Sequence, residues 1–373
     1  MSTSFVEAVA IDEVRPHPNA DRLEVAVVRG ATVVVGKGTF QAGDHAAYFP
    51  PDTLIPNELS TRLGVQKYLK HGVYQEGEGA SQCRVAGCLL RGQPSFGFLA
   101  KIDECLYYDG QSVAYALGDD IGKAIGAKKY EPPVRLTGSE CSSEHPLFHK
   151  YSEIENYNRY PNAIPEGTPV RITEKIHGTN SRVGIVRVPG EDGQIVWEEM
   201  AGSHRVRRKR PVEGQTCEYW EPIFRQGVKD LLEGLRGVFL ADSAVILFGE
   251  IYGPGVQDMD YGVSPGQRGY RLFDISIDGH YMPWELVEGW CSNAKYGVQA
   301  VPLLYKGPFS KDLVEKYTYG PTTIGEPRGA FKGREGIVIT PLDDKLSAVL
   351  GGRMILKSVS ADYLDRKGGQ DNE

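Results

Sequence analysis

A lysine at the end of an apolar-alternating run is the first candidate for chemistry. Lys175 follows the run 170–174 and precedes the stretch 176–181, after which a second alternating run covers 182–188. This pattern predicts a strand, a tight loop and another strand, with the lysine presented at the loop. Such a lysine becomes a nucleophile when its neighbours lower its pKa. The alternative interpretation is a surface lysine before a β-turn, which is usual for an isolated short match.

Four further stretches follow the lysine loop in order along the chain. They centre on Glu250, Phe273, Glu335 and Lys357, each within or beside an apolar-alternating run. A sequence such as Phe-Gly-Glu or Arg-Glu-Gly beside a strand is usually a turn, so each stretch by itself is a weak signal. Their joint presence after Lys-x-His-Gly-Thr-Asn at 175–180 is not expected by chance.

This set resembles the motifs of RNA ligases in the covalent nucleotidyltransferase superfamily. The resemblance runs over about half the chain, and it implies that Lys175 takes AMP from ATP through its side-chain nitrogen. The attack on the α-phosphate needs a neutral amine, although free lysine has a pKa of about 10.4. Lys357 is the candidate for a second ammonium that lowers this pKa and neutralises charge on the phosphate. His177 is the third catalytic candidate, beside the departing pyrophosphate or the metal.

The resemblance also implies which side chains hold the nucleotide. Phe273 offers a flat face to adenine, and Asn180 reaches the ribose or a phosphate. Arg205, in a loosely matching register, is the candidate phosphate-binding arginine. Glu174 and Ile176 contribute backbone groups to the adenine edge. The expected nucleotide contacts are therefore Glu174, Ile176, Asn180, Arg205, Glu250, Phe273 and Lys357.

Carboxylates are the expected ligands of the Mg²⁺ or Mn²⁺ ion that accompanies ATP. Magnesium prefers oxygen ligands and retains several waters, so one or two carboxylates suffice. Glu335 is the first choice and Glu250 the second, although Glu250 has the alternative role of accepting hydrogen bonds from the ribose hydroxyls. Asp258 and Asp260 are interpreted as turn residues rather than as a metal site.

One departure from the family pattern concerns a phosphate contact. Phage relatives often carry Lys-x-Lys in the last motif, whereas Lys357 is followed by Ser358 and Val359. The candidate substitutes for the missing lysine are Arg353 and the basic run 205–210. That run is either a solvated loop or a phosphate-binding edge beside the active site.

The first 115 residues have the pattern of an all-β domain. Short runs at 5–11, 23–28, 32–35 and 45–49 alternate or are β-branched, and turn residues separate them. This spacing predicts a small barrel. The stretch 15–25, which contains His-Pro-Asn-Ala-Asp, resembles the opening of OB-fold tRNA-binding domains. We therefore expect an OB-fold-like nucleic-acid-binding β-barrel at 1–115, followed by a linker at 116–149.

The region 150–373 is expected to be the nucleotidyltransferase domain. Helical spacing predicts helices at 221–235, 285–290 and 310–317, the last with Ser310 as N-cap. Alternating runs predict strands at 244–251, 270–277, 336–340 and 353–359. The expected fold class is therefore α+β, with an N-terminal OB-like barrel before an α+β domain of antiparallel sheets.

Composition limits the class of protein. The chain has 373 residues, of which 24% are charged, and a net charge of −7, so any nucleic-acid surface must be local. Its 6 cysteines show no zinc-like spacing and are expected to be reduced thiols. The N-terminus lacks the pattern of a signal peptide, and the apolar runs are too short to span a bilayer. We expect a cytoplasmic protein that acts as a monomer.

The expected activity is that of an ATP-dependent RNA ligase that forms lysyl-AMP and joins 5′-phosphate and 3′-OH RNA ends, repairing nicks in a duplex. The alternatives are a DNA ligase, an mRNA-capping-type nucleotidyltransferase, and a non-catalytic RNA- or tRNA-binding protein. The first two usually carry Lys-x-Asp-Gly and place an OB domain after the last motif. Here the OB-like domain precedes the motifs and 361–373 follow them. The complete set of lysine and glutamate residues argues against the third.

Overall fold

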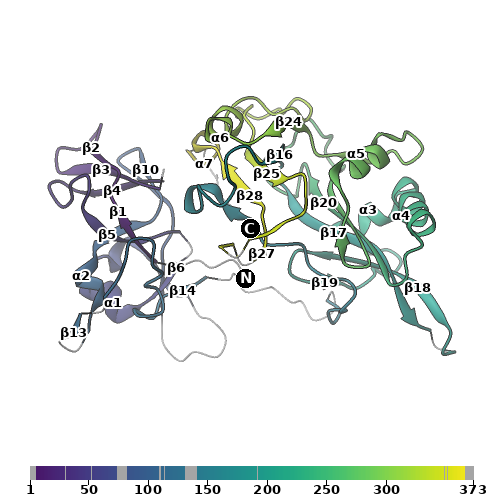
Figure 1. Ribbon diagram of the computed structural model, residues 1–373, viewed down its shortest axis with the longest axis horizontal. Coiled ribbons are helices and arrows are strands. Elements are labelled where there is room, and N and C mark those ends of the chain that lie inside the picture. Colours follow the sequence, from purple (N-terminus) through teal and green to yellow (C-terminus); the bar gives the residue numbers. More distant parts are fainter. Residues whose placement is uncertain are drawn as a thin grey trace. The chain divides into compact units, whose positions relative to one another are not determined.

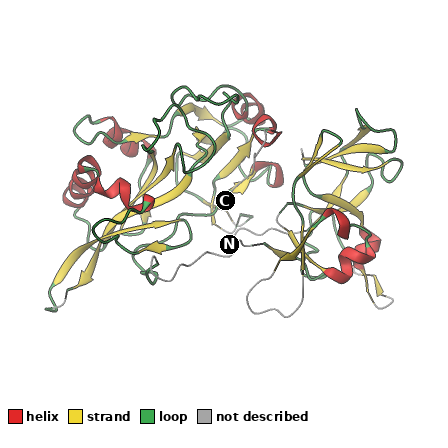
Figure 2. Cartoon of the chain, turned by 180° about the vertical axis from the view of Figure 1, so that it is seen from behind, coloured by secondary structure: helices red, strands yellow, loops and turns green. Residues whose placement is uncertain are grey.

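The computed structural model describes residues 6–29, 31–51, 53–73, 82–108, 111–112, 114–130, 141–190, 192–347, 349–350 and 352–365. By its internal contacts the chain divides into two units, Met1–Arg135 and Leu136–Glu373 (Figure 1). Strands predominate over helices in both units (Figure 2). No helix of the described residues is long and apolar enough to cross a membrane. All six cysteines are free thiols, as the sequence predicted.

The first unit consists of short antiparallel strands in small sheets. One sheet has the order β1 (Glu7–Ala10), β5 (His45–Phe49) and β11 (Phe98–Lys101). A second is the meander β2 (Glu13–Pro16), β3 (Leu23–Val28) and β4 (Ala31–Gly36). A third has the order β14 (Lys128–Lys129), β6 (Thr53–Pro56), β8 (Gln82–Arg84) and β7 (Lys70–Val73).

Two hairpins and three short helices complete the first unit. The hairpins pair β9 (Cys88–Leu90) with β10 (Gln93–Ser95), and β12 (Tyr107–Tyr108) with β13 (Gln111–Ser112). The helices are α1 (Asn57–Arg62), the 3₁₀ helix η1 (Gln66–Tyr68) and α2 (Ile102–Leu106).

Strand β5 is buried on both faces at the centre of the first unit. Ala46 and Tyr48 belong to one apolar core, and Ala47 and Phe49 belong to another. This division follows from the alternation of side chains along a strand. A strand that is buried on both faces needs apolar side chains at successive positions, and β5 has such a continuous apolar run.

The expected barrel is not closed: in the part of the chain that the structure describes, the first unit forms separate sheets. Strand β4 meets the β10 segment through single hydrogen bonds instead. The Phe96 N–H donates to the Thr32 carbonyl at 2.8 Å, and the Val34 N–H donates to Ser95 Oγ at 3.0 Å.

The stretch that resembles an OB-fold opening has a structural role in this unit. His17 is buried, and its Nδ1 accepts the Asn19 N–H at 3.0 Å. Its Nε2 must then carry the proton, which it donates to the Leu90 carbonyl at 3.0 Å. The Asn19 amide donates to the Arg91 carbonyl at 3.1 Å. The His-Pro-Asn turn therefore fastens β2 and β3 to the β9–β10 hairpin.

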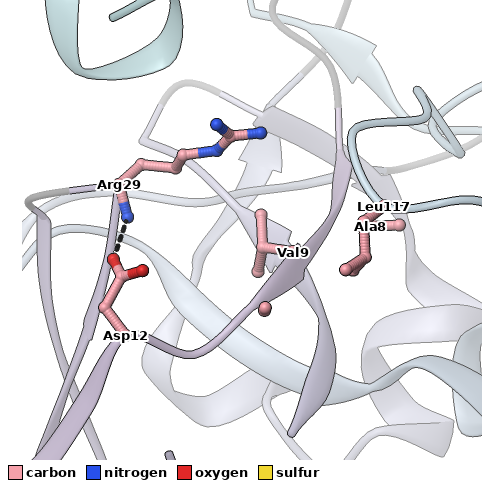
Figure 3. Close-up of a pocket in the computed structure, with 6 residues that line it drawn as sticks. Ala8, Val9, Asp12, Arg29 and Leu117 are labelled. Atoms are coloured by element: carbon pink, nitrogen blue, oxygen red, sulfur yellow. Dashed lines mark hydrogen bonds between the residues drawn. The ribbon is translucent and has the colours of Figure 1, made fainter. Parts of the chain in front are cut away.

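A shallow pocket of about 240 Å³ lies beside β1 (Figure 3). The Arg29 backbone N–H donates to Asp12 at 2.9 Å, and the Arg29 guanidinium pairs with Glu7. Both charged groups at the pocket are therefore engaged within the protein. The lining residues are Ala8, Val9, Ala10, Asp12, Arg29 and Leu117.

The second unit contains two larger sheets. We call the first the large sheet; its strands are, in order, β19 (Arg207–Arg208), β18 (Ile195–Ser203), β17 (Thr179–Pro189), β20 (Ala244–Tyr252), β21 (Gly269–Ile277) and β22 (His280–Tyr281). These pairs are antiparallel, and β23 (Gln299–Ala300) adds a parallel pair to β21.

The small sheet has five strands. Their order is β15 (Glu155–Asn156), β28 (Leu356–Val359), β25 (Gly336–Pro341), β16 (Pro169–Lys175) and β24 (Leu303–Pro308). All pairs are antiparallel except β15 with β28. A separate hairpin joins β26 (Leu346–Ser347) to β27 (Gly352–Arg353). The antiparallel character expected from the sequence is thus the rule, with two parallel exceptions.

Helices α3 and α4 pack on the large sheet, against β17 and β20, and α6 packs on β25 and β28 of the small sheet (Figure 1). Val245 and Leu247 of β20 pack with Leu231 of α4, while Ile246 and Phe248 face the other way, into a core shared with Ile355. The helices are α3 (Glu221–Phe224), α4 (Gln226–Phe239), α5 (Trp284–Ser292), α6 (Lys311–Thr318) and α7 (Ala361–Asp365), with 3₁₀ turns η2 (Tyr157–Arg159) and η3 (Glu218–Trp220).

Two expected elements of the second unit are each divided in two. The helix at 221–235 breaks at Arg225, whose φ of −73° and ψ of 126° are extended. This break brings Gly227 so close to the Tyr296 carbonyl that a Cβ would lie 1.7 Å from its oxygen. The strand at 353–359 is interrupted before β28, where the Ile355 N–H bonds to the Arg353 carbonyl at 2.9 Å.

The described parts of the expected linker 116–149 pack within one unit or the other. Ile121 is buried in the first unit's core with Val6. Phe148 is buried in the second unit's core with Phe248. Residues 131–140 lie outside the described residues.

Candidate active site

Strand register places the two candidate lysines on one face of the small sheet. Thr173 is opposite Val338, and Val338 is opposite Lys357. Residues directly opposite in a ladder share a face, and so do residues two apart along a strand. Lys175, two residues after Thr173 and opposite Gly336, therefore lies on the same face as Lys357. The other face packs on α6.

The facing side of the large sheet presents the next two candidates. Asn180 is opposite Glu250 in the β17–β20 ladder. Glu250 lies two residues after Phe248, which belongs to the core between the sheets. Electrostatic interactions of Glu250 with both Lys175 and Glu335 place the candidates from the two sheets in one site. The short connection from β16 to β17 joins the sheets at this point.

An ion pair is the centre of the site. Lys175 Nζ lies 2.6 Å from Glu335 Oε1, and the Glu335 side chain is 1% exposed. Glu335 directly precedes β25, and a backbone hydrogen bond fixes its position. Its carbonyl accepts the Ser360 N–H at 2.8 Å. A Cβ at Gly336 would lie 2.0 Å from the Ser358 carbonyl oxygen, so only glycine allows this close pairing of β25 with β28.

Glu250 has a strongly perturbed acidity. Burial raises the pKa of its carboxyl group to about 8, against the opposing effect of the Lys175 ammonium. The negative charge of Glu335 raises it further, whereas the Gly178 N–H, which bonds to the carboxylate, lowers it. The Glu250 carboxyl group therefore releases its proton at a higher pH than an ordinary glutamate does.

His177 is held from three sides. Its Nε2 lies 2.7 Å from Asp258 Oδ1, and its Nδ1 lies 2.9 Å from the Tyr363 hydroxyl of α7. Its backbone N–H donates to the Tyr261 hydroxyl at 2.7 Å. Nδ1 is also 3.8 Å from Glu335 Oε2, so the ring adjoins the ion pair. Both ring nitrogens therefore have partners within the protein in this state.

Sequence reasoning missed two of these contacts. Asp258 was interpreted as a turn residue, and Tyr363 was given no role. They lie 81 and 186 residues from His177, a separation at which no periodic pattern links positions. Tyr363 is fully buried, which an aromatic residue in a short C-terminal helix does not signal by itself.

The two candidates for contact with the adenine edge, Glu174 and Ile176, are buried, and their groups mostly contact other parts of the protein. The Glu174 carboxylate accepts hydrogen bonds from Thr322 Oγ1 and from the Thr323 N–H at 2.8 Å, and it is 1% exposed. Its backbone N–H donates to the Pro302 carbonyl at 2.9 Å. Ile176 is 4% exposed and part of the apolar core under α4.

Asn180 and Phe273 are better placed to meet a ligand. The buried Asn180 Oδ1 accepts no hydrogen bond from any described residue. An unpaired buried oxygen is costly, so it marks a place for a donor from outside. Phe273 occupies a β-bulge in β21, since Phe248 is opposite Asp274 but Gly249 is opposite Leu272. Its partly buried ring meets Tyr151 edge-on, with centroids 4.9 Å apart.

The arginine candidates for phosphate binding are largely engaged within the protein. Arg205 lies in the turn after β18, and its backbone N–H donates to Ser203 Oγ at 3.3 Å. In the basic run, Arg207 pairs with Glu198 at 2.7 Å and Arg210 with Glu199 at 2.9 Å. Because these arginines already pair with glutamates, the basic run is not an uncompensated positive surface for phosphate binding.

Arg353 is part of a buried charge cluster between the sheets. Its guanidinium lies 2.9 Å from Asp274 Oδ2 and 2.6 Å from Asp344 Oδ1. Asp274 also accepts the Tyr151 hydroxyl at 2.7 Å and lies 3.5 Å from Arg171. The cluster ties β21 of the large sheet to β16 of the small one, next to Phe273. Arg353 is therefore fixed by the fold rather than available for a phosphate.

Comparison with known families fits this arrangement. The RNA ligase family model matches residues 168–359, just over half of the chain and the whole span from β16 to β28. The chain belongs to the RNA ligase family. A model of an OB-fold domain matches residues 5–102 of this RNA ligase, so the α+β class with an OB-fold region ahead of the ligase domain is confirmed. Among curated protein sequences, none matches the chain.

Solved structures of an RNA ligase from Naegleria gruberi share the fold. Its complex with PPi is 23% identical, with a TM-score of 0.68 over 97% of this chain and 98% of that one. A lysine-to-methionine variant with AMP and Mn has a TM-score of 0.69 at 23% identity over 99% and 100% of the chains. A lysine-to-alanine variant with ATP and Mn has a TM-score of 0.69 at 23% identity over 97% and 100%.

Proposed function

We propose that this RNA ligase uses ATP to join a 5′-phosphate RNA end to a 3′-OH RNA end through a lysyl-AMP intermediate. The observation that carries the proposal is the Lys175–Glu335 ion pair at 2.6 Å, on a sheet face shared with Lys357 and close to Glu250. Membership of the RNA ligase family supports RNA as the substrate. The relatives bound to ATP, AMP and PPi support ATP as the nucleotide.

The first step forms lysyl-AMP. Lys175 Nζ attacks the α-phosphorus, an N–P bond forms, and the bond to the β-phosphate oxygen breaks to release pyrophosphate. Nζ must first lose a proton, and Glu335 Oε1 is an acceptor at 2.6 Å. The Lys357 ammonium on the same face favours the neutral form of Lys175 and offsets the charge that develops on the phosphate.

The next two steps transfer AMP and seal the strand. An oxygen of the 5′-phosphate attacks the AMP phosphorus, the N–P bond breaks, and Lys175 regains its amine. The 3′-OH oxygen then attacks the 5′-phosphate phosphorus and displaces AMP, which leaves a phosphodiester bond. Phe273 stacks on adenine, and Asn180 Oδ1 accepts a hydrogen bond from a ribose hydroxyl.

The donor set at the site fits Mg²⁺ or Mn²⁺. Glu335 and Glu250 offer carboxylate oxygens, whereas the described residues contain no group of three or more His, Cys, Asp or Glu that could enclose a metal. A magnesium ion that keeps its waters and binds ATP oxygens needs one or two carboxylates, and Glu335 is the main candidate. When bound, the ion supplies charge neutralisation at the phosphates.

The first unit is proposed to hold the RNA strands beside the break. Its OB-fold match supports this role, because OB folds bind single-stranded nucleic acid on an open face. We propose that residues 1–115 bind the RNA, that residues 116–149 connect the two domains, and that residues 150–373 carry out the nucleotide chemistry.

Lys175→Ala is expected to abolish transfer of label from α-labelled ATP to the protein, because it removes the amine that is proposed to attack the α-phosphorus. The measurement is gel analysis of the protein after incubation with labelled ATP and magnesium. Lys345→Ala, which removes an exposed lysine of the same unit, is the matched control and should label like the wild type. Equal labelling of Lys175→Ala would show that the nucleophile is misassigned.

The nucleic-acid preference is tested with single-stranded, splinted and nicked-duplex substrates that carry ribose or deoxyribose on each side of the break. We expect sealing of a nicked duplex with a ribose 3′-OH. Equal sealing of an all-DNA nick would favour a DNA ligase. A wild-type protein that never acquires label would favour the RNA-binding alternative.

A further inference from the structure

Two segments far apart in the chain hold the imidazole ring of His177. Its Nε2 lies 2.7 Å from Asp258 Oδ1, in the loop after β20, and its Nδ1 lies 2.9 Å from the Tyr363 hydroxyl of α7. A carboxylate only accepts hydrogen bonds, so Nε2 carries a proton that is directed at Asp258. The Tyr363 ring also meets the His177 ring edge-on, with centroids 5.2 Å apart. These contacts fix the rotation of the imidazole ring.

The loop that carries Asp258 is itself fastened to the rest of the unit. Asp260 accepts the Arg328 N–H at 3.0 Å and pairs with the Arg328 guanidinium at 2.8 Å. The next residue, Tyr261, has a φ of 49°, and its hydroxyl accepts the His177 backbone N–H at 2.7 Å. One fastened turn therefore holds both the backbone and the ring of His177.

Helix α7 is tied to the backbone at the start of β25. The Ser360 N–H, just before the helix, donates to the Glu335 carbonyl at 2.8 Å, and the Ser360 hydroxyl donates to the Arg334 carbonyl at 3.1 Å. The same hydroxyl accepts the Tyr363 N–H at 3.2 Å, and Tyr363 is fully buried. The backbone that places Glu335 therefore also places the Tyr363 hydroxyl against His177.

The held ring borders the Lys175–Glu335 ion pair. His177 Nδ1 lies 3.8 Å from Glu335 Oε2, and His177 is 4% exposed. The proposed first step releases pyrophosphate at this pair, and a histidine beside it offsets charge on the departing oxygen. Such a contribution depends on orientation, since a misplacement of about 1 Å can cost about 10²-fold in rate.

We propose that Asp258 and Tyr363 are positioning residues for lysyl-AMP formation, which act by holding His177 in the orientation that serves the departing pyrophosphate. The proposal rests on the proposed ligase function, because that reaction is the one that releases pyrophosphate. Neither residue is assigned a contact with the reacting atoms, and each acts through the histidine. Sealing of an adenylylated strand displaces AMP rather than pyrophosphate, so that step does not need this orientation.

The test compares Asp258→Ala, Asp258→Asn and Tyr363→Phe in the full chain. The Asp258 side chain is 45% exposed, so its truncation leaves no sealed cavity, and Phe keeps the volume of the Tyr363 ring. Single-turnover self-labelling is measured over a range of ATP concentrations. Sealing of a nick whose 5′ end already carries AMP is measured with the same proteins. Thermal unfolding checks that each variant is folded.

At saturating ATP, Asp258→Ala and Tyr363→Phe should label about 10- to 100-fold more slowly, the usual cost of losing a partner that orients a functional histidine. The ATP concentration that gives half the maximal rate should not change, because a group that serves the transition state alone affects the rate constant. Asn at position 258 keeps an acceptor for the Nε2 proton and should recover part of the rate. Sealing of the adenylylated nick should stay at the wild-type rate.

Two matched changes remove similar groups elsewhere in the second unit. Glu153→Ala removes a half-exposed carboxylate that lies 3.2 Å from Nε2 of another histidine, His204. Tyr305→Phe removes a hydroxyl that donates to a backbone carbonyl at 2.8 Å. Both control variants should label like the wild type, because neither group contacts His177.

A double-mutant cycle shows whether the effect passes through the histidine. In a His177→Ala background, Asp258→Ala should slow labelling no further. Additive losses, an equal loss in the sealing of the adenylylated nick, or wild-type labelling by a folded Ala or Phe variant would each overturn the proposal. If the His177→Ala background is too slow to measure, the comparison of the two steps decides; if Tyr363→Phe does not fold, the Asp258 variants decide. A wild type that never labels itself would instead overturn the ligase function.

Discussion

At the scale of single residues, the site depends on charged groups brought out of water. Lys175 and Glu335 form an ion pair, and burial together with the negative charge of Glu335 raises the pKa of the nearby Glu250 carboxyl group. Such mutually dependent charges are typical of functional sites rather than of a stabilising network. Changes at these positions should therefore alter activity and pH dependence more than folding.

Glu335→Ala and Lys357→Ala should each slow self-adenylylation by about 10² to 10³, the usual cost of removing one electrostatic contact from a transition state. Single-turnover labelling with ATP and magnesium measures the rate. Transfer from a pre-adenylylated RNA strand is measured beside it, to show which step each residue serves. Wild-type rates in both variants would contradict the assignment.

Glu250 predicts a specific pH dependence of stability in the absence of ATP. The pKa of the Glu250 carboxyl group is about 8 in the folded protein and 4.5 for a glutamate in the unfolded chain. Between pH 4.5 and pH 8 the folded protein therefore keeps a proton on Glu250 that the unfolded chain has released. The wild type should lose stability relative to Glu250→Gln as the pH rises from about 5 to about 8, and the difference should then level off. Urea unfolding at several pH values tests this, and a pH-independent difference would refute the raised pKa.

At the scale of elements, the strands were largely predictable and the contacts between them were not. The bounds of β3 and β5 follow from alternation and flanking turns, as predicted. The break at Arg225 was missed because Ile223 was assigned to the same apolar stripe as Val228, although the two are five residues apart and do not share one face of a single helix. The His177–Tyr363 contact was missed because it depends on how distant segments pack, which no local pattern records.

The pairing of β25 with β28 provides a test at this scale. Gly336→Ala would place a methyl group 2.0 Å from the Ser358 carbonyl oxygen, so the strands must separate. Overpacking of this kind costs about 1 to 3 kcal/mol. The change should lower the unfolding midpoint and also slow labelling, since Lys357 lies in β28. Gly352→Ala in β27, where no atom lies within 4 Å of a new Cβ, is the control. Equal stability of the two variants would contradict the tight pairing.

At the scale of the whole molecule, the candidate residues for lysyl-AMP formation lie in one unit. They extend from Glu174 to Lys357, inside Leu136–Glu373. The family resemblance supplied this list from the sequence, but it did not reveal that the described strands of the first unit form separate sheets. The closure of a barrel depends on how strands bend in three dimensions, which turn residues alone do not specify.

A truncated chain that starts at Leu136 should still label itself with AMP but should seal RNA poorly, including strands that are already adenylylated. The reason is that it would lose the proposed RNA grip and keep every candidate for nucleotide chemistry. Circular dichroism and thermal unfolding establish whether the truncated chain folds. Loss of labelling in a folded chain would show that the first unit takes part in the nucleotide step, and full sealing would show that it is dispensable.

The separation of His177 from Tyr363 has a consequence for the order in which the enzyme matures on the ribosome. The nucleophile strand β16 emerges early, but Glu335 follows Lys175 by 160 residues, and Tyr363 follows His177 by 186. A nascent chain therefore carries the candidate lysine and His177 long before Glu335 and Tyr363, which contact them in the folded protein. Burial of the lysine between the sheets waits until β25 and β28 have been added beside β16. The Lys175–Glu335 and His177–Tyr363 contacts can therefore both be in place only after synthesis has passed α7.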